Sequence, residues 1–185
     1  MSPAIRSPAD VLGRPMATVE NYLHGLSTRR GRNDDWNFEL LAFDLGQETY
    51  AIDILRLRGI VTRRHATEVP RAPAYLLGVI SLRGQIVPLV DLRLRLGLPG
   101  SPQTRATRIL IVDQAGESFG LLVDSVRQVV RLRDDEMETR PPALAGRESE
   151  FIAGIARPRT GGMLILLGVD AVLKLQLAGP ERGGR

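Results

Sequence analysis

The sequence contains no cysteine and few of the other residues that usually carry chemistry. Its 185 residues include two histidines, and only 4% of them are aromatic. Without thiols the chain forms no disulfide, no thiolate nucleophile and no cysteine-ligated metal site. Lysine is nearly absent too, because Lys174 is the only one and arginine supplies the other basic side chains. A chain without cysteine is expected to reside in the cytoplasm.

Long apolar segments are also lacking. No apolar run approaches the roughly 18 residues that a transmembrane helix needs, and residues 1–17 lack the continuous apolar core of a secretory signal. We therefore expect no direct insertion into a membrane. A chain of 185 residues has room for one domain, or for two very small ones packed together.

The ionisable residues do not form a catalytic or metal-binding motif. His24 and His65 stand apart from any serine or threonine motif, and His65 is expected to be a solvated loop residue. Carboxylates at the ends of expected strands usually bind turn amides, and an acidic run such as residues 134–136 usually faces water. The strand-end carboxylates are Asp53, Asp91 and Asp124. We expect no enzyme activity, no cofactor, no metal site and no small-molecule substrate.

The positive charge leaves a second kind of function open. The net charge is +4 and the pI is about 10.3, and several arginines lie near the chain ends, at positions 6, 14, 29, 30, 32, 182 and 185. A basic surface can bind nucleic acid, whereas charges in a tail usually just keep a disordered segment solvated. We keep a basic nucleic-acid-binding module as the alternative function.

Alternating apolar residues predict short strands in the middle of the chain. Residues 41–45 and 50–55 carry large apolar side chains at every second position, with a turn at 46–48 between them. Pro88 interrupts a third apolar run, which predicts an edge strand or a bulge there because proline cannot donate to the ladder. Further strands are expected at 109–113, 119–124, 126–132 and 163–167.

An internal repeat organises these strands. Residues 38–61 align without a gap on residues 107–130, so that Tyr50 meets Phe119 and Ile60 meets Val129. A second stretch aligns at a larger offset, where Gly78 meets Gly154. The core therefore consists of two copies of one unit, at roughly 38–98 and 107–175.

Each copy holds about five short strands, too few to bury a sufficient core alone. Closing each sheet into a small barrel and packing the barrels together removes exposed edges and adds burial. We therefore expect an all-β fold of two packed barrels, with short helices near 92–96 and 170–175. The order of the repeat leaves open whether strands are exchanged between the copies. Residues 1–36 and 177–185, rich in proline and glycine, are expected to be tails.

Two segments of this core resemble a known family. The later one is Gly120-Leu121-Leu122-Val123-Asp124-Ser125-Val126, and the more specific one is Leu82-Arg83-Gly84-Gln85-Ile86-Val87-Pro88-Leu89-Val90-Asp91-Leu92-Arg93. Together with residues 50–55, Gly154 and the apolar run at 163–167, they resemble the CheW family over about residues 37–176.

The resemblance implies two five-stranded barrels of the SH3-like type and a non-catalytic adaptor function. Members of the family couple chemoreceptors to the histidine kinase CheA. They bind the regulatory domain of the kinase and the cytoplasmic tip of the receptor. The resemblance therefore implies a cytoplasmic protein that its partners recruit to receptor arrays at the membrane.

The resemblance also implies partner-binding residues. Arg83 and Gly84 match a motif that lies close to the receptor-contact surface of the family. Gly78 and Val129 align with positions implicated in partner contacts, and Leu57 lies in a strand region implicated in binding. Arg83 is the strongest functional candidate, because an arginine beside a glycine turn can form directed bonds outward. Gly78 and Val129 could instead serve packing alone.

The chain departs from the family at three places. Gly59 stands where many members carry an acidic residue, and Arg58 changes the sign of the local charge. Arg108 occupies a position where an apolar residue is common. The N-terminal segment before Asp35 exceeds the usual short N-terminus. These differences predict a specialised member whose cognate receptor and kinase differ from the standard pair.

Overall fold

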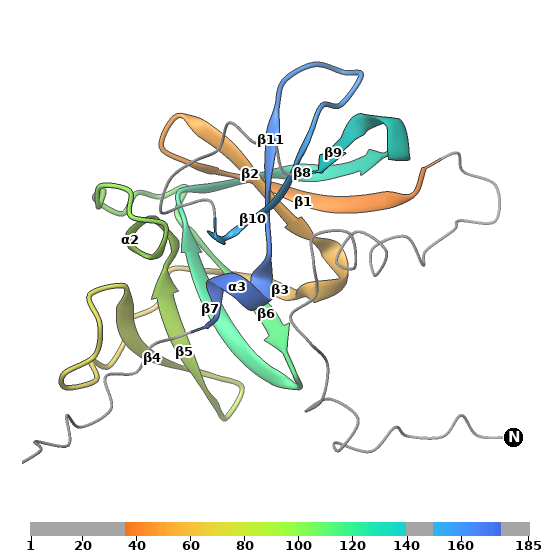
Figure 1. Ribbon diagram of the computed structural model, residues 1–185. Helices are drawn as coiled ribbons and strands as arrows, with labels where there is room; N and C mark the ends of the chain where they lie inside the picture. The colour runs from red at the N-terminus through yellow and green to blue at the C-terminus, as the bar shows by residue number, and fades with distance from the viewer. Residues whose placement is uncertain (1–35, 140–149, 175–185) are drawn as a thin grey trace, which may run out of the picture.

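The computed structural model describes residues 36–139 and 150–174, which fold into two β-sheets (Figure 1). The six-stranded sheet has the order β8-β1-β2-β11-β10-β9, and the five-stranded sheet has the order β3-β6-β7-β5-β4. The six-stranded sheet consists of β1 (Phe38–Leu45), β2 (Glu48–Asp53), β8 (Ser125–Leu132), β9 (Met137–Thr139), β10 (Ile152–Ala156) and β11 (Leu164–Leu167). The five-stranded sheet consists of β3 (Leu57–Thr62), β4 (Leu76–Leu82), β5 (Gln85–Asp91), β6 (Arg108–Gln114) and β7 (Glu117–Val123).

Short helical segments join the strands. The helix α2 (Leu92–Arg95) follows β5, and α3 (Val169–Val172) follows β11. Two 3-10 turns, η2 (Ile54–Arg56) and η3 (Asp134–Glu136), lie before β3 and β9. The expected all-β fold with short helices near 92–96 and 170–175 is confirmed.

The repeat is visible as two matching series of elements. The first copy runs β1 to β5 and then α2, and the second runs β6, β7, β8, β10, β11 and then α3. In each sheet, two strands of one copy lie between strands of the other. The pair β6–β7 lies between β3 and β5, and the pair β1–β2 lies between β8 and β11. Each sheet therefore contains strands from both copies.

Parallel pairing marks the places where the copies interleave. The strand β5 pairs in parallel with β7, and β11 pairs in parallel with β2, whereas the other pairs are antiparallel. Asp53 ends β2, and its carboxylate accepts a hydrogen bond of 2.9 Å from the backbone N–H of Leu55. The cap turns the chain into η2 and then into β3, which belongs to the other sheet.

Each sheet curls around an apolar core of its own. The edge strands β3 and β4 contribute Val61 and Ile80 to the same cluster. The loop after β3 is bonded to β4 as well, because Thr67 and Val79 exchange two backbone hydrogen bonds of 2.8 and 2.9 Å. The core of the six-stranded sheet contains Phe38, Leu40, Ala42, Ala51, Leu132, Ala153, Ala156, Leu164 and Leu166. These contacts give both sheets the curvature of small barrels.

A third, larger core lies between the barrels. It contains residues from both sheets and from both helices, among them Phe43 and Tyr50, which are fully buried with ring centroids 6.4 Å apart. Phe119, the repeat equivalent of Tyr50, packs against the same core. Aromatic residues of both copies therefore pack in or against this core.

Pro88 does not mark an edge strand. β5 lies between β4 and β7, so the expected edge position is wrong. Pro88 is paired with Val79, whose own backbone groups bond Thr67 on the far side. The ladder between β5 and β7 begins one residue later, at Leu89. The nitrogen of Pro88 thus faces away from β4 and lies one residue before the ladder with β7, and the nearby register shift lies in β4 between Leu76 and Gly78.

The expected tails lie almost wholly outside the described residues. Trp36 is the first residue described, and its ring lies under the guanidinium of Arg131, 5.1 Å from the ring centroid. The backbone N–H of Asn37 donates to the carbonyl of Leu132. These contacts join the start of the described chain to β8.

Candidate partner-binding surfaces

The turn between β4 and β5 carries Arg83 and Gly84. It is a two-residue hairpin turn whose central residues both have positive φ, +50° at Arg83 and +82° at Gly84. This combination defines a type I′ turn, which matches the twist of the flanking strands. Both residues are exposed, and within the described ranges Arg83 has no hydrogen-bond or ion-pair partner. The turn therefore presents a free guanidinium at one end of the barrel.

Gly78 lies beneath a loop. It is buried, with φ +133°, and a Cβ at this position would lie 2.2 Å from the carbonyl oxygen of Thr67. Its repeat equivalent Gly154 has the same role, since a Cβ there would lie 2.9 Å from the carbonyl oxygen of Glu138. Only glycine allows such a close backbone approach. The structure therefore gives Gly78 a packing constraint and places it away from the surface.

Leu57 and Val129 lie on different sheets. Leu57 begins β3, is half-buried and packs against the shared core. Val129, on β8, is 45% exposed and lines a groove of about 220 Å³ beside Pro158 and Arg159. The interpretation of Val129 as a core residue is thus wrong. Four of the five sequence-predicted residues lie on the five-stranded sheet, and Val129 lies on the other one.

Ile86 is a surface residue that the sequence did not single out. It follows the hairpin turn on β5 and is 75% exposed, the largest value among the large apolar side chains of the described residues. Ile60, the repeat equivalent of Val129, is also exposed, on β3 of the same sheet. Exposed apolar residues near a free arginine are typical of protein-binding surfaces.

Two of the three departures from the family lie on the same sheet, and the third, the N-terminal segment before Asp35, lies outside the described residues. Arg58 forms an ion pair of 3.0 Å with Asp113 of the neighbouring strand β6. A Cβ at Gly59 would have open space around it. The guanidinium of Arg108 donates hydrogen bonds to the carbonyl oxygens of Arg105 and Thr107. Asp113 therefore offsets the positive charge that Arg58 brings next to Gly59.

The strand-end carboxylates have structural partners. Besides Asp53, Asp91 accepts a hydrogen bond of 3.2 Å from the backbone N–H of Leu94 at the start of α2. Asp124 accepts one of 2.7 Å from the backbone N–H of Gly46. His65 lies exposed in a loop. Across residues 36–139 and 150–174, no group of acidic or histidine side chains is arranged to hold a metal ion.

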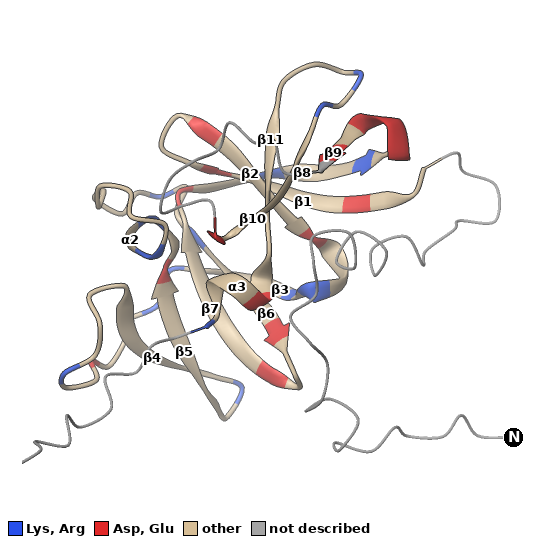
Figure 2. Cartoon of the chain, viewed as in Figure 1, with Lys and Arg blue, Asp and Glu red and all other residues tan. Residues whose placement is uncertain are grey.

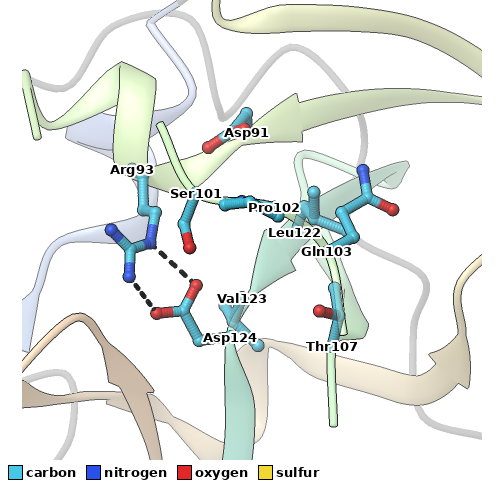
Figure 3. Close-up of a pocket in the computed structure, with 9 residues that line it drawn as sticks. All are labelled: Asp91, Arg93, Ser101, Pro102, Gln103, Thr107, Leu122, Val123 and Asp124. Carbon is cyan, nitrogen blue, oxygen red and sulfur yellow. Dashed lines mark hydrogen bonds and ion pairs between the residues drawn. The ribbon is translucent and has the colours of Figure 1, made fainter. Parts of the chain in front are cut away.

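A small polar pocket lies beside Asp124 (Figure 3). Its volume of about 10 Å³ is roughly the space that one water molecule needs. The Arg93 side chain borders it and donates two hydrogen bonds to the Asp124 carboxylate, of 2.8 and 2.5 Å. The pocket is too small for a substrate, and its charged residues are already bonded: Arg93 to Asp124, and Asp91 to the backbone of Leu94.

Asp124 joins the two barrels. Arg93 comes from α2, Gly46 from the β1–β2 turn, and the backbone N–H of Asp124 donates to the carbonyl of Asp44 on β1. The hydrogen bonds from Arg93 hold the pKa of Asp124 below its usual value, although partial burial opposes them. At Asp44, burial raises the pKa, but hydrogen bonds from Ser125, Arg127 and Thr49 outweigh it and the net pKa is lowered.

These carboxylates predict a loss of stability in acid. A lowered folded pKa contributes stability that is fully present above the unfolded value of about 3.9 and is lost as the pH falls through the folded pKa. We expect urea unfolding midpoints to decrease below about pH 5. The Asp124→Asn variant should be less stable than the wild type at pH 7, and the difference should shrink towards pH 3. An equally steep acid loss in Asp124→Asn would contradict this role.

Within the described ranges, no helix has the length and apolar character to cross a membrane. The fold and its surfaces define a class: a strand-exchanged pair of small β-barrels with exposed surfaces suited to protein contacts.

Comparison with known proteins identifies the family. The sequence model described as CheW-like domain matches residues 39–177. The chain is 34% identical to the chemotaxis protein CheW of Rhizobium meliloti, over 72% of this chain and 86% of that protein. It is 30% identical to CheW of Bacillus subtilis, over 73% and 86%. The chain belongs to the CheW-like family.

A solved structure agrees with this assignment. The scaffolding protein TtCheW from Thermoanaerobacter tengcongensis superposes with a TM-score of 0.70 at 29% identity. The superposition covers 75% of this chain and 94% of the solved chain. The resemblance stated from the sequence motifs is therefore confirmed over most of the described residues.

Proposed function

We propose that this chain is a non-catalytic adaptor that couples chemoreceptors to a CheA-type histidine kinase in chemotaxis or related chemosensory signalling. The observation that carries this function is the match of both sequence and fold to CheW scaffolding proteins along the whole duplicated core. Strand-end carboxylates bonded to backbone amides support the non-catalytic assignment.

The partners follow from this function. The chain binds the regulatory domain of the kinase through one surface and the cytoplasmic tip of the receptor through another. It works in the cytoplasm and reaches receptor arrays through these partners. Exposed surfaces on both barrels support binding at two places.

The sequence-predicted residues divide between direct and indirect roles. Arg83 contacts a partner directly, and Gly84 allows the turn that carries it; the exposure of both residues supports these roles. Val129 contributes to a separate surface on the other barrel. Leu57 and Gly78 act indirectly, because one packs against the shared core and the other anchors the loop over β4.

We expect Arg83→Ala to weaken partner binding without loss of folding. Alanine and arginine both carry a Cβ, so the φ of +50° strains both equally. The loss should be about threefold to tenfold if the guanidinium meets a polar partner at the rim of an interface. The measurement is the affinity for the kinase regulatory domain and for the receptor tip, each by titration calorimetry. Wild-type affinity for both would contradict a direct role for Arg83.

Co-elution with the regulatory domain of a CheA-type kinase from the same organism tests the function itself. A stable complex at physiological salt is expected. A folded chain that forms no complex with this domain or with a receptor tip would contradict the adaptor function. The nucleic-acid alternative would gain support if the chain bound DNA with a steep dependence on salt.

A further inference from the structure

The arginines of the two barrels differ in their partners. On the six-stranded sheet and its loops, four exposed arginines form ion pairs with acidic residues of the same barrel. The pairs are Arg127–Asp44 at 2.6 Å, Arg131–Glu39 at 3.2 Å, Arg157–Glu138 at 2.9 Å and Arg159–Asp135 at 2.6 Å. Their charge is therefore largely neutralised locally.

The loops and turns of the five-stranded sheet carry arginines without such pairs. Five exposed side chains have no hydrogen-bond or ion-pair partner in the described part of the chain. They are Arg63, Arg64, Arg71, Arg83 and Arg105. Figure 2 shows basic residues on the loop that leads into β4 and at the turn between β4 and β5. We name this set the arginine surface; it extends along the length of β4, because Arg71 precedes that strand and Arg83 follows it.

The repeat provides a direct comparison between the barrels. Arg83 and Arg159 occupy equivalent positions in the two copies. Both the side chain and the backbone of Arg159 are bonded: its guanidinium pairs with Asp135, and its backbone N–H donates to the Glu136 carboxylate at 2.7 Å. Arg83 has neither contact. The same position is therefore neutralised in one barrel and left charged in the other.

The backbone does not favour arginine at two of these positions. Arg71 has φ +60° and follows Pro70 in a turn closed by a hydrogen bond from Ala72 to Val69. Proline followed by positive φ is the pattern of a type II turn, which prefers glycine at the position of Arg71. Arg83 has φ +50° at the first central position of a type I′ turn, which prefers asparagine or glycine.

Such strained positions point to a use for the side chain. The loop that carries Arg71 is also anchored, because the Thr67–Val79 bonds hold it against β4. The guanidinium groups are thus displayed from ordered backbone, and less freedom is lost when they bind. Unpaired arginines on a fixed frame are suited to two-point hydrogen bonding with carboxylates.

We propose that the arginine surface binds an acidic segment of a partner protein. Two features favour a protein over a nucleic acid. Ile86 is 75% exposed next to the Arg83 turn, and Ile60 is exposed on the same sheet, so apolar area accompanies the charge as in protein interfaces. The inference rests on the proposed function, since that partner is the receptor or the kinase. It adds that the partner of this barrel is acidic and that its binding is salt-dependent.

The test uses the full chain and a fluorescently labelled octaglutamate peptide as probe. Binding is measured by anisotropy at about 20 mM salt, where charges are weakly screened, and at about 300 mM salt, where they are strongly screened. We expect binding at low salt only, and a loss of about tenfold in the Arg71→Gly/Arg83→Gly variant. The matched control is Arg127→Gln/Arg157→Gln, which removes two paired charges of the other barrel and should bind the peptide like the wild type.

Measuring the stability of the variant distinguishes a binding role of Arg71 and Arg83 from a structural role. Glycine relieves the positive φ, so the Arg71→Gly/Arg83→Gly variant should unfold at the same or a higher urea concentration than the wild type. Weaker peptide binding with undiminished stability supports the inference. No peptide binding at low salt, or equal binding by this variant and the control, would overturn it. So would binding of a DNA duplex by a chain that ignores the peptide.

The outcomes also separate this inference from the proposed function. The chain could form the kinase complex with an affinity that neither salt nor the Arg71→Gly/Arg83→Gly variant changes. That result would support the adaptor function and contradict the acidic partner. The chain could instead bind octaglutamate through Arg71 and Arg83 but form no complex with kinase or receptor. That result would support the arginine surface and contradict the adaptor function.

Discussion

Gly78→Ala should lower the free energy of unfolding by about 3 kcal/mol or more. The new Cβ would lie 2.2 Å from the carbonyl oxygen and 2.7 Å from the carbonyl carbon of Thr67, and the φ of +133° is one that alanine rarely adopts. Both neighbouring atoms belong to backbone, so the clash cannot be relieved by a side-chain rotation. The Thr67–Val79 hydrogen bonds that hold the loop against β4 would break. Urea unfolding followed by circular dichroism measures the loss.

Gly84→Ala is the matched control. This glycine also has positive φ, +82°, but nothing lies within 4 Å of the added Cβ. Only the backbone strain remains, which costs about 1 kcal/mol. A similar loss in both variants would show that the close approach at Gly78 contributes nothing.

Arg95→Ala should destabilise the chain by about 2–4 kcal/mol. The guanidinium lies 4.8 Å from the ring centroid of Tyr75 and 4.7 Å from that of Phe151. It also donates hydrogen bonds of 2.8 Å each to the carbonyl oxygens of Val172 and Lys174. Tyr75 and Phe151 are equivalent residues of the two copies, so Arg95 binds both barrels and the end of α3 at once. Thermal and urea unfolding measure the effect.

Arg95→Lys separates charge from shape. Lysine keeps the charge but cannot stack as a plane between two rings or donate from a fixed fork, so most of the loss should remain. Arg64→Ala removes an arginine that is exposed and, in the described ranges, unpaired, and it should change stability by less than about 0.5 kcal/mol. Full recovery by lysine would show that Arg95 acts as a point charge alone.

The fold was predictable where the pattern is local. The alternation at residues 41–45 and 50–55 predicted the hairpin β1–β2, and the repeat predicted that the second copy would follow the first element by element. The pairing of strands was not predictable, because a repeat tells which segments are alike and carries no information on which segments hydrogen-bond. Pro88 shows the limit: its missing donor can fall at a ladder end within an interior strand.

The candidate site was predictable where a residue type has a single structural use. The Arg83-Gly84 turn could be recognised because glycine and positive φ go together. The interpretation of Val129 as core failed. Alternation tells only which residues share a face of a strand, and the edge strand β8 exposes part of each of its faces. Ile86 was missed because it belongs to an apolar run, and the run does not show that the end of the hairpin leaves this side chain 75% exposed. Which arginines are neutralised depends on contacts between distant strands, and no local pattern records them.

The exchange of strands also determines what a half of this chain could do. A single copy holds two strands for one sheet and three for the other, so alone it would complete neither. Two separate half-chains related by a twofold axis would complete both, which makes the present protein equivalent to an intertwined homodimer whose subunits are linked through residues 98–107. We therefore expect the barrels to unfold as one cooperative unit, and a cut in that linker to leave two fragments that stay associated until both lose their structure.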